Sequence, residues 1–154
     1  MTETFDDKNF GESSEMSSLT LDWGKPGDYI LGTFVRVRHN IETQFGPNSI
    51  YEILAERGEF HELEGKGRNA KPKDAPTVIS KGDTWSVWGR GDIFIGQMNS
   101  LRPGQIVKLL FAEEKDGKNG PWKLVKVYAP KTNEGKPMMN QEWLDGQGAV
   151  AGDL

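Results

Sequence analysis

The distribution of apolar and polar positions predicts five β-strands and one short helix. The predicted strands are residues 29–38, 49–55, 84–88, 105–112 and 122–129, each between Gly, Pro or Asn turn signals. A further short strand is expected at residues 59–63. The helix is predicted at residues 92–101, from apolar residues at Ile93, Ile95, Met98 and Leu101 and a candidate N-cap at Asp92.

The order of these elements indicates a fold class. Strand, strand, strand, helix, strand, strand is the order of the OB barrel, a five-stranded Greek-key barrel. We therefore expect an all-β, five-stranded OB-type barrel with a short helix between strands 3 and 4, and flexible N- and C-terminal tails. Closure into a barrel would also protect the edges of so small a sheet.

The first predicted strand has two distinct faces. Gly32 within it suggests a bend or a bulge. Strict alternation places on the core face Leu31, Val35 and Val37. On the opposite face it places Phe34, Arg36 and Arg38.

Both ends of the chain differ in composition from its middle. Residues 1–26 are rich in Ser, Glu and Asp without a sustained period, so we expect a disordered acidic segment. Residues 27–131 form the predicted OB domain, in which residues 64–82 are interpreted as one long loop. Residues 132–154 are Gly-rich and polar, and we expect a flexible acidic tail.

The net charge is unevenly divided along the chain. The formal total is −4, but residues 1–28 carry −5, residues 29–131 carry +4 and residues 132–154 carry −3. A mildly basic body therefore stands between acidic ends, and this asymmetry is more informative than the total charge.

Composition argues against several kinds of site. The chain has no Cys and two His, His39 and His61, so we expect neither disulfides nor a metal centre. No apolar run approaches the roughly 18 residues of a membrane span. The N-terminal residues lack a secretory pattern, and we expect a cytoplasmic protein.

The acidic residues show no pattern typical of an enzyme. They alternate along a strand and its exit, which is typical of a solvated face, and no Gly-rich phosphate-binding motif is present. We expect no catalytic activity and no cofactor. A small metal-dependent nuclease is the enzyme alternative, but it requires converging carboxylates that the sequence does not show.

Basic and aromatic residues coincide at positions that we expect to be exposed. The expected nucleic-acid-binding residues are Phe34, Arg36, Arg38, Lys66, Arg68, Lys71, Lys73, Trp88, Arg90, Trp122 and Lys123. Phe34 and Trp88 would stack on bases. The residues expected to contact phosphates are Arg36, Arg38, Lys66, Arg68, Lys71, Lys73 and Arg90. A solvated basic loop and core aromatics are the plainer interpretation of each feature alone, whereas their combination favours binding of a single strand.

These motifs resemble a known family. The segments GDYILGTFVRVRHNIETQFGPNSIYEILA, GDTWSVWG and KNGPWKLVKVYA, with an Ile/Met-containing helix and a Pro-Gly turn between them, are similar to the small OB-fold single-stranded DNA-binding proteins of bacteriophages and related mobile elements. The resemblance covers about residues 27–130. It implies sequence-independent binding of single-stranded DNA in replication or recombination, in the bacterial host cytoplasm, with Trp88, Arg90 and Trp122 bordering the groove.

The family resemblance also implies an acidic C-terminal tail that recruits replication or recombination proteins. The candidate partner-binding residues are Trp143, Leu144, Asp145, Asp153 and Leu154. The acids of this tail are sparse, and the chain ends in Asp153-Leu154 rather than in an acidic run capped by an aromatic. A protein-interaction or assembly module without nucleic-acid binding remains the alternative function, because a fold does not fix a function.

Overall fold

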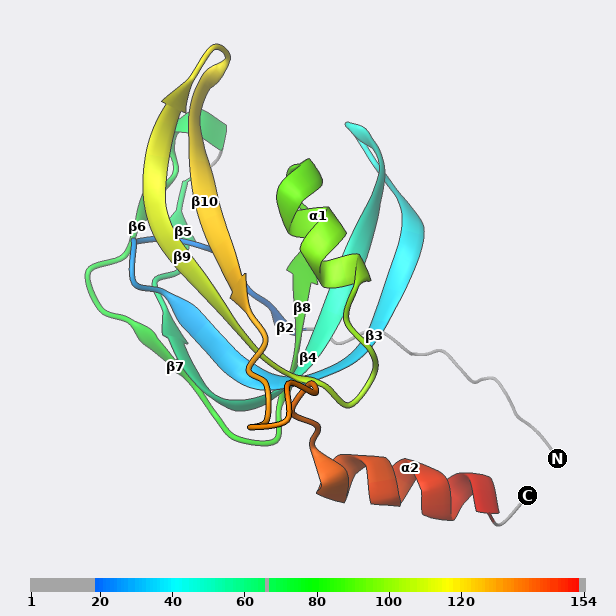
Figure 1. The fold of residues 1–154 in the computed structure, drawn as a ribbon. Coiled ribbons are helices and arrows are strands. Elements are labelled where there is room, and N and C mark those ends of the chain that lie inside the picture. Colours follow the sequence, from blue (N-terminus) through cyan, green and yellow to red (C-terminus); the bar gives the residue numbers. More distant parts are fainter. Residues whose placement is uncertain (1–18, 66, 153–154) are drawn as a thin grey trace, which may run out of the picture.

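The computed structural model describes residues 19–65 and 67–152, without the side chains of Arg68 and of residues 148–152. It contains one strongly curled sheet with a short helix in its opening (Figure 1). The long strands are β3 (Tyr29–Thr43), β4 (Gly46–Phe60), β8 (Thr84–Trp88), β9 (Ile106–Gly117) and β10 (Gly120–Tyr128), and the helix is α1 (Asp92–Asn99). The five predicted strands and the helix are confirmed. Most of the observed strands are longer than predicted and extend into the segments that were expected to be turns.

The sheet is open, and β3 lies in its middle. The strands follow the order β10-β9-β3-β4-β8-β2, with β2 at Leu19–Thr20. β7 (Thr77–Ile79) pairs with the end of β4. The curvature arises because β3 pairs with β4 along most of its length and with β9 through residues 29–33.

The predicted long loop contains short regular elements. β5 (Leu63–Glu64) and β6 (Lys71–Pro72) pair with each other, and a 3-10 turn, Gly67–Asn69, lies between them. The prediction of one unstructured loop over residues 64–82 is therefore wrong. The separate strand predicted at residues 59–63 is also wrong, since β4 continues through Phe60.

The alternation predicted for β3 is wrong in its first half. Phe34 pairs with Ile53, whereas Arg36 pairs with Glu52, so the pairing register shifts between Phe34 and Arg36. Such a bulge reverses which face a side chain points to. Phe34 therefore lies in the core, 2% exposed, while Val37, beyond the bulge, packs against the core as predicted.

A second register shift occurs at Gly32, as its presence in the strand predicts. A Cβ at this position would lie 2.2 Å from the carbonyl oxygen of Leu54, so no other residue fits here without a backbone shift.

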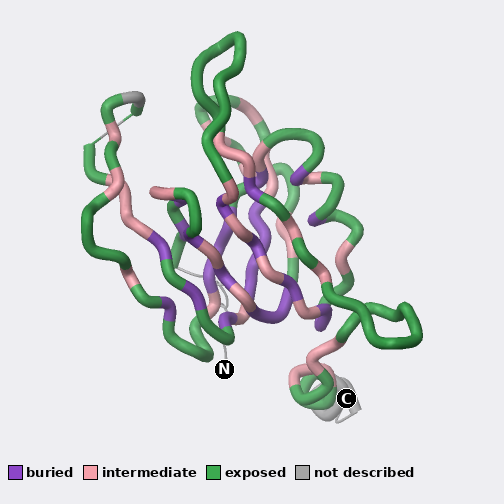
Figure 2. Tube along the Cα trace, turned by 60° about the vertical axis from the view of Figure 1, so that its left-hand side comes forward, coloured by how far each residue is buried: buried purple, intermediate pink, exposed green. Residues whose placement is uncertain are grey.

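The core fills the concave side of the sheet and is rich in aromatic rings. Tyr51 meets the ring of Phe94 edge-on at 6.1 Å between centroids, and Phe60 meets Trp85 at 5.2 Å. In Figure 2 the buried residues line the middle of the curled sheet, while the hairpin tips are exposed. α1 closes the opening with Phe94 and Met98, and its N-cap is Gly91 rather than the predicted Asp92.

The N-terminal part of the described chain belongs to the core. Leu21 and Trp23 are 4% and 5% exposed, and the Leu21 amide donates to the carbonyl of Ser86 on β8 at 2.9 Å. On the other side, Lys123 Nζ of β10 donates to the carbonyl oxygen of Trp23. Residues 21–23 thus connect the two ends of the sheet, and the predicted disorder of residues 1–26 is wrong from residue 19 onward.

A buried carboxylate fixes the turn that follows this segment. Asp28 is 2% exposed, and its Oδ2 accepts hydrogen bonds from the amides of Gly24, Lys25 and His61 at 2.8–3.0 Å. Its Oδ1 contacts His61 Nδ1 at 2.7 Å. The turn is therefore anchored to the residue that follows β4.

The C-terminal segment also packs on the sheet, contrary to the predicted flexible tail. Asn140 donates its amide N–H to the Gly104 carbonyl and its side-chain N–H to Thr33 Oγ1, both at 2.7 Å. It also caps α2 (Gln141–Gly152), since its side-chain oxygen accepts from the Trp143 amide at 3.1 Å. Figure 1 shows α2 at the end of the molecule away from the hairpin tips.

The role of residues 21–23 predicts the effect of removing the Trp23 side chain. We expect Trp23→Ala to lower the free energy of unfolding by about 3–5 kcal/mol, as deletion of a buried aromatic does. Urea unfolding followed by circular dichroism measures the change. Trp122→Ala is the control, because Trp122 is 47% exposed, and should cost about 0.5 kcal/mol or less. Equally small losses in both variants would contradict the docking of this segment.

Candidate nucleic-acid interface

A row of three residues crosses β3, β4 and β8 on the face opposite the core. Arg38 pairs with Ile50, and Ile50 pairs with Trp88. Ile50 is 2% exposed although its neighbour Tyr51 faces the core. Trp88 remains 36% exposed. In this row the Trp88 ring and the Arg38 guanidinium group therefore lie on either side of the buried Ile50.

Arg38 has hydrogen-bonding capacity that the described residues do not use. Its Nε is buried and finds no acceptor in the part of the chain that the structure describes. A guanidinium group carries five N–H donors, and a buried one without an acceptor is unfavourable. The Nε itself is out of reach of solvent, so a group from outside would meet the partly exposed remainder of the Arg38 side chain.

Arg36 is already engaged by the fold. In the adjacent row, its Nε lies 2.5 Å from Oε1 of Glu52, which is fully buried. A buried carboxylate needs such a partner, so neutralising Glu52 is the first role of Arg36. Its side chain is nevertheless 47% exposed, and the predicted contact with nucleic acid stays a prediction.

The β3–β4 hairpin adds a second aromatic next to Trp88. Phe45, at the turn, is 91% exposed, and residues 43–48 together with Trp88 line a cavity of about 350 Å³. Two hydrogen bonds join β4 to the segment after Trp88, from Asn48 Nδ2 to the Gly89 carbonyl at 3.1 Å and from the Gly89 amide to the Ser49 carbonyl at 2.9 Å. Trp88 is thus held beside the hairpin.

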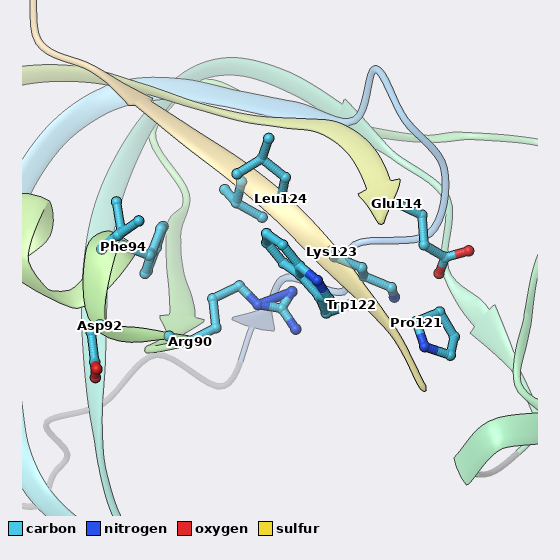
Figure 3. A pocket seen from close by; sticks show the side chains of 11 residues that line it. Arg90, Asp92, Phe94, Glu114, Pro121, Trp122, Lys123 and Leu124 are labelled. Atoms are coloured by element: carbon cyan, nitrogen blue, oxygen red, sulfur yellow. The ribbon is translucent and has the colours of Figure 1, made fainter. Parts of the chain in front are cut away.

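A larger cavity lies on the other side of the same segment. Residues 90–94 face residues 121–125 of β10 across about 680 Å³ (Figure 3). Trp122 is half exposed in its wall, and Figure 3 shows the Arg90 side chain reaching toward it. The Arg90 Nη1 is buried and has no hydrogen-bond partner among the described residues. The two cavities therefore flank residues 88–90, and each has a partly exposed tryptophan.

Lys123, which was expected among the nucleic-acid-binding residues, points inward. Its Nζ donates to Trp23 and lies 5.7 Å from the centroid of the Phe111 ring. Burial lowers the pKa of Lys123, and the neighbouring Arg90 lowers it further. We conclude that Lys123 serves mainly to hold β10 against residues 21–23.

Phe34 is the clearest error among the predicted site residues. The bulge in β3 turns it into the core, where its ring centroid is 6.5 Å from that of Tyr51. A ring that is 2% exposed has no free face, so Phe34 cannot stack on a base. Phe45 takes its place as an exposed aromatic, and its position in the turn QFGPN was a signal available in the sequence.

The predicted basic loop is not brought together with the two cavities. Lys71 is exposed on β6, and Lys73 pairs with Glu62 at 3.1 Å. The Arg68 side chain and the whole of Lys66 lie outside the described residues. None of the described residues of this loop lines either cavity.

The predicted partner-binding residues divide between described and undescribed positions. Leu144 packs on Gly104, because a Cβ placed on Gly104 would lie 2.7 Å from Cδ2 of Leu144. Trp143 is half-buried. Asp145 is exposed and accepts a hydrogen bond from Gln141 at 2.8 Å. Asp153 and Leu154 lie outside the described residues. The structure therefore gives Leu144 a role in docking α2.

Within residues 19–65 and 67–152, no cluster of three or more His, Asp or Glu side chains has the arrangement of a metal site. No helix in the same part of the chain is long and apolar enough to cross a membrane. Comparison with known proteins adds no assignment, since no family model, curated protein or solved structure matches this chain.

The pairing of Arg36 with Glu52 predicts a structural effect of its removal. We expect Arg36→Met to lower the free energy of unfolding by about 2–3 kcal/mol, because it leaves a buried carboxylate without this partner. Thermal unfolding measures the loss. The double variant Arg36→Met/Glu52→Gln should recover part of it, and a single variant as stable as the parent would show that the pair contributes nothing.

Proposed function

We propose that this protein is an OB-type, sequence-independent single-stranded DNA-binding protein. In OB folds, oligonucleotides bind the face of strands 2 and 3 between the loop joining strands 1 and 2 and the loop joining strands 4 and 5. If β3, β4, β8, β9 and β10 are taken as strands 1 to 5, that face is formed by β4 and β8 and those loops are the β3–β4 and β9–β10 hairpins. The strand order and the helix between β8 and β9 support this assignment.

The observation that carries the proposal is the set of exposed aromatic and cationic groups on this face and beside it. Phe45, Trp88 and Trp122 are all partly or fully exposed and come from the two hairpins and the strand between them. Arg38 and Arg90 each have a buried N–H without a partner among the described residues. Exposed aromatics stack on any base and cations such as Arg38 contact phosphates, a combination that binds single strands largely through groups common to all sequences.

Charge supports the same function. The body of the chain, residues 29–131, carries +4 although the whole chain carries −4. A basic body attracts a polyanion, and the acidic ends weaken that attraction at long range. A role in phage DNA replication or recombination rests on the family resemblance.

The stacking role of Trp88 predicts a loss of affinity in its alanine variant. We expect Trp88→Ala to weaken binding of oligo-dT by about 1–3 kcal/mol, the contribution of one stacked base. Fluorescence anisotropy with labelled oligo-dT measures it. Tyr128→Ala is a matched control. Tyr128 is 46% exposed, and it lies at the end of β10 that is farther from Trp122 and the cavity. The assignment fails if a folded Trp88→Ala protein binds as tightly as the parent.

The phosphate contact of Arg38 predicts a change in salt dependence. The slope of log K against log salt concentration changes by about 0.7 for each phosphate contact to a single strand. We expect Arg38→Met to make the slope shallower by about this amount. Lys81→Met is the control, since Lys81 is exposed and pairs with Glu56, away from both cavities. A slope in folded Arg38→Met that equals that of the parent protein would contradict the phosphate contact.

A further inference from the structure

The cavity between α1 and β10 has the size and lining of a pocket for a small planar ligand. Its volume of about 680 Å³ lies within the range of roughly 300–1,000 Å³ that is typical of small-molecule sites. Its apolar walls are Phe94, Leu124 and Val125, and Trp122 is half exposed at one side. It occupies the space between the end of β8 and the edge of β10, which do not pair in the described sheet. An aromatic ring is the ligand group that such walls favour.

One polar group in this cavity lacks a partner. The Arg90 Nη1 is buried and donates to nothing in the part of the chain that the structure describes, and Figure 3 shows its guanidinium group among the lining side chains. A buried donor that is left unpaired is costly, so a ligand that brings an acceptor gains from this site. Neither Asp92 nor Glu114, the two carboxylates that line this cavity, accepts from Arg90 Nη1, so a ligand can supply the acceptor.

The charges around the cavity favour a neutral ligand over a phosphate. Arg90 and Lys123 are matched by Asp92 and Glu114, which line the same cavity, so the formal charge of its ionisable groups sums to zero. Lys123 is also engaged with the Trp23 carbonyl. A dianionic phosphate would therefore meet two carboxylates, whereas a neutral base meets no net repulsion.

We propose that this cavity holds one unpaired base of the bound strand and that Arg90 donates a hydrogen bond to a carbonyl oxygen of that base. This rests on the proposed single-strand binding and adds a preference to it. Thymine O4 and guanine O6 are acceptors, whereas adenine has an amino donor at the corresponding position. At Arg90 the amino group would lie against a donor-only side chain, so adenine lacks the hydrogen bond that a carbonyl oxygen makes with Arg90 there.

The preference is tested with ligands that differ at one group. Hypoxanthine is a purine that carries a carbonyl oxygen where adenine carries its amino group, so short oligo-dI and oligo-dA share the size of the base. We expect the parent protein to bind oligo-dI about tenfold more tightly than oligo-dA in anisotropy titrations, which corresponds to the discrimination of about one good polar contact to a base edge.

Variants assign the preference to Arg90. In Arg90→Met the ratio of the two affinities should fall to about one, because the donor is lost while much of the volume remains. In Trp88→Ala both affinities should fall and the ratio should stay as in the parent, because Trp88 lines the other cavity. Circular dichroism establishes that each variant is folded, and if Arg90→Met does not fold, the comparison of the two ligands on the parent protein still decides.

The outcomes separate this inference from the proposed function. Binding of oligo-dT with equal affinities for oligo-dI and oligo-dA would overturn the base pocket and leave single-strand binding intact. An unchanged ratio in a folded Arg90→Met protein would overturn the role of Arg90. Absence of binding to oligo-dT, oligo-dI and oligo-dA would refute the proposed function itself.

Discussion

The two ends of the curled sheet are held together by residues 21–23 rather than by direct strand pairing. Leu21 bonds to the backbone of β8, and the Trp23 carbonyl accepts from Lys123 of β10. Placing a lysine ammonium group in partly apolar surroundings is unfavourable unless it is paired, and here the carbonyl oxygen and the ring of Phe111 compensate. The larger cavity lies between residues 90–94 and 121–125, next to this connection through Lys123, and it contains the unpaired Arg90.

The exposed aromatic and cationic groups depend on the same frame. Trp88 is the last residue of β8 and lies beside the β3–β4 hairpin. The two hydrogen bonds of Gly89 hold the chain after Trp88 against β4. Trp122, the third residue of β10, lines the cavity on the other side of residues 88–90. The two cavities thus lie on either side of residues 88–90. This arrangement suits the proposed binding of a DNA single strand between the two hairpins. Arg36 shows that a basic residue near such a face need not be free, since Glu52 already binds it.

The fold was more predictable from the sequence than the site. Residues 84–88 were predicted with the observed bounds because Asp83 and Gly89 enclose five residues, four of which are β-branched or aromatic. Phe34 was assigned to the wrong face because a bulge leaves no mark in a period-two pattern. The docking of Trp23 and Leu144 was missed because it depends on contacts with residues far away in the chain. Arg90 and Trp122 were predicted to bind nucleic acid, but only the structure shows that they face one cavity.

The most direct test of the proposed function is to locate the strand on the protein. Oligo-dT that contains 5-bromodeoxyuridine can be cross-linked to the protein by ultraviolet light, and the modified peptides can be identified by mass spectrometry. The account predicts cross-links in peptides that contain Phe45, Trp88 and Trp122, and none in α2. Cross-links confined to α2 or to the β5–β6 hairpin, or no cross-links under conditions where the oligonucleotide binds, would contradict it.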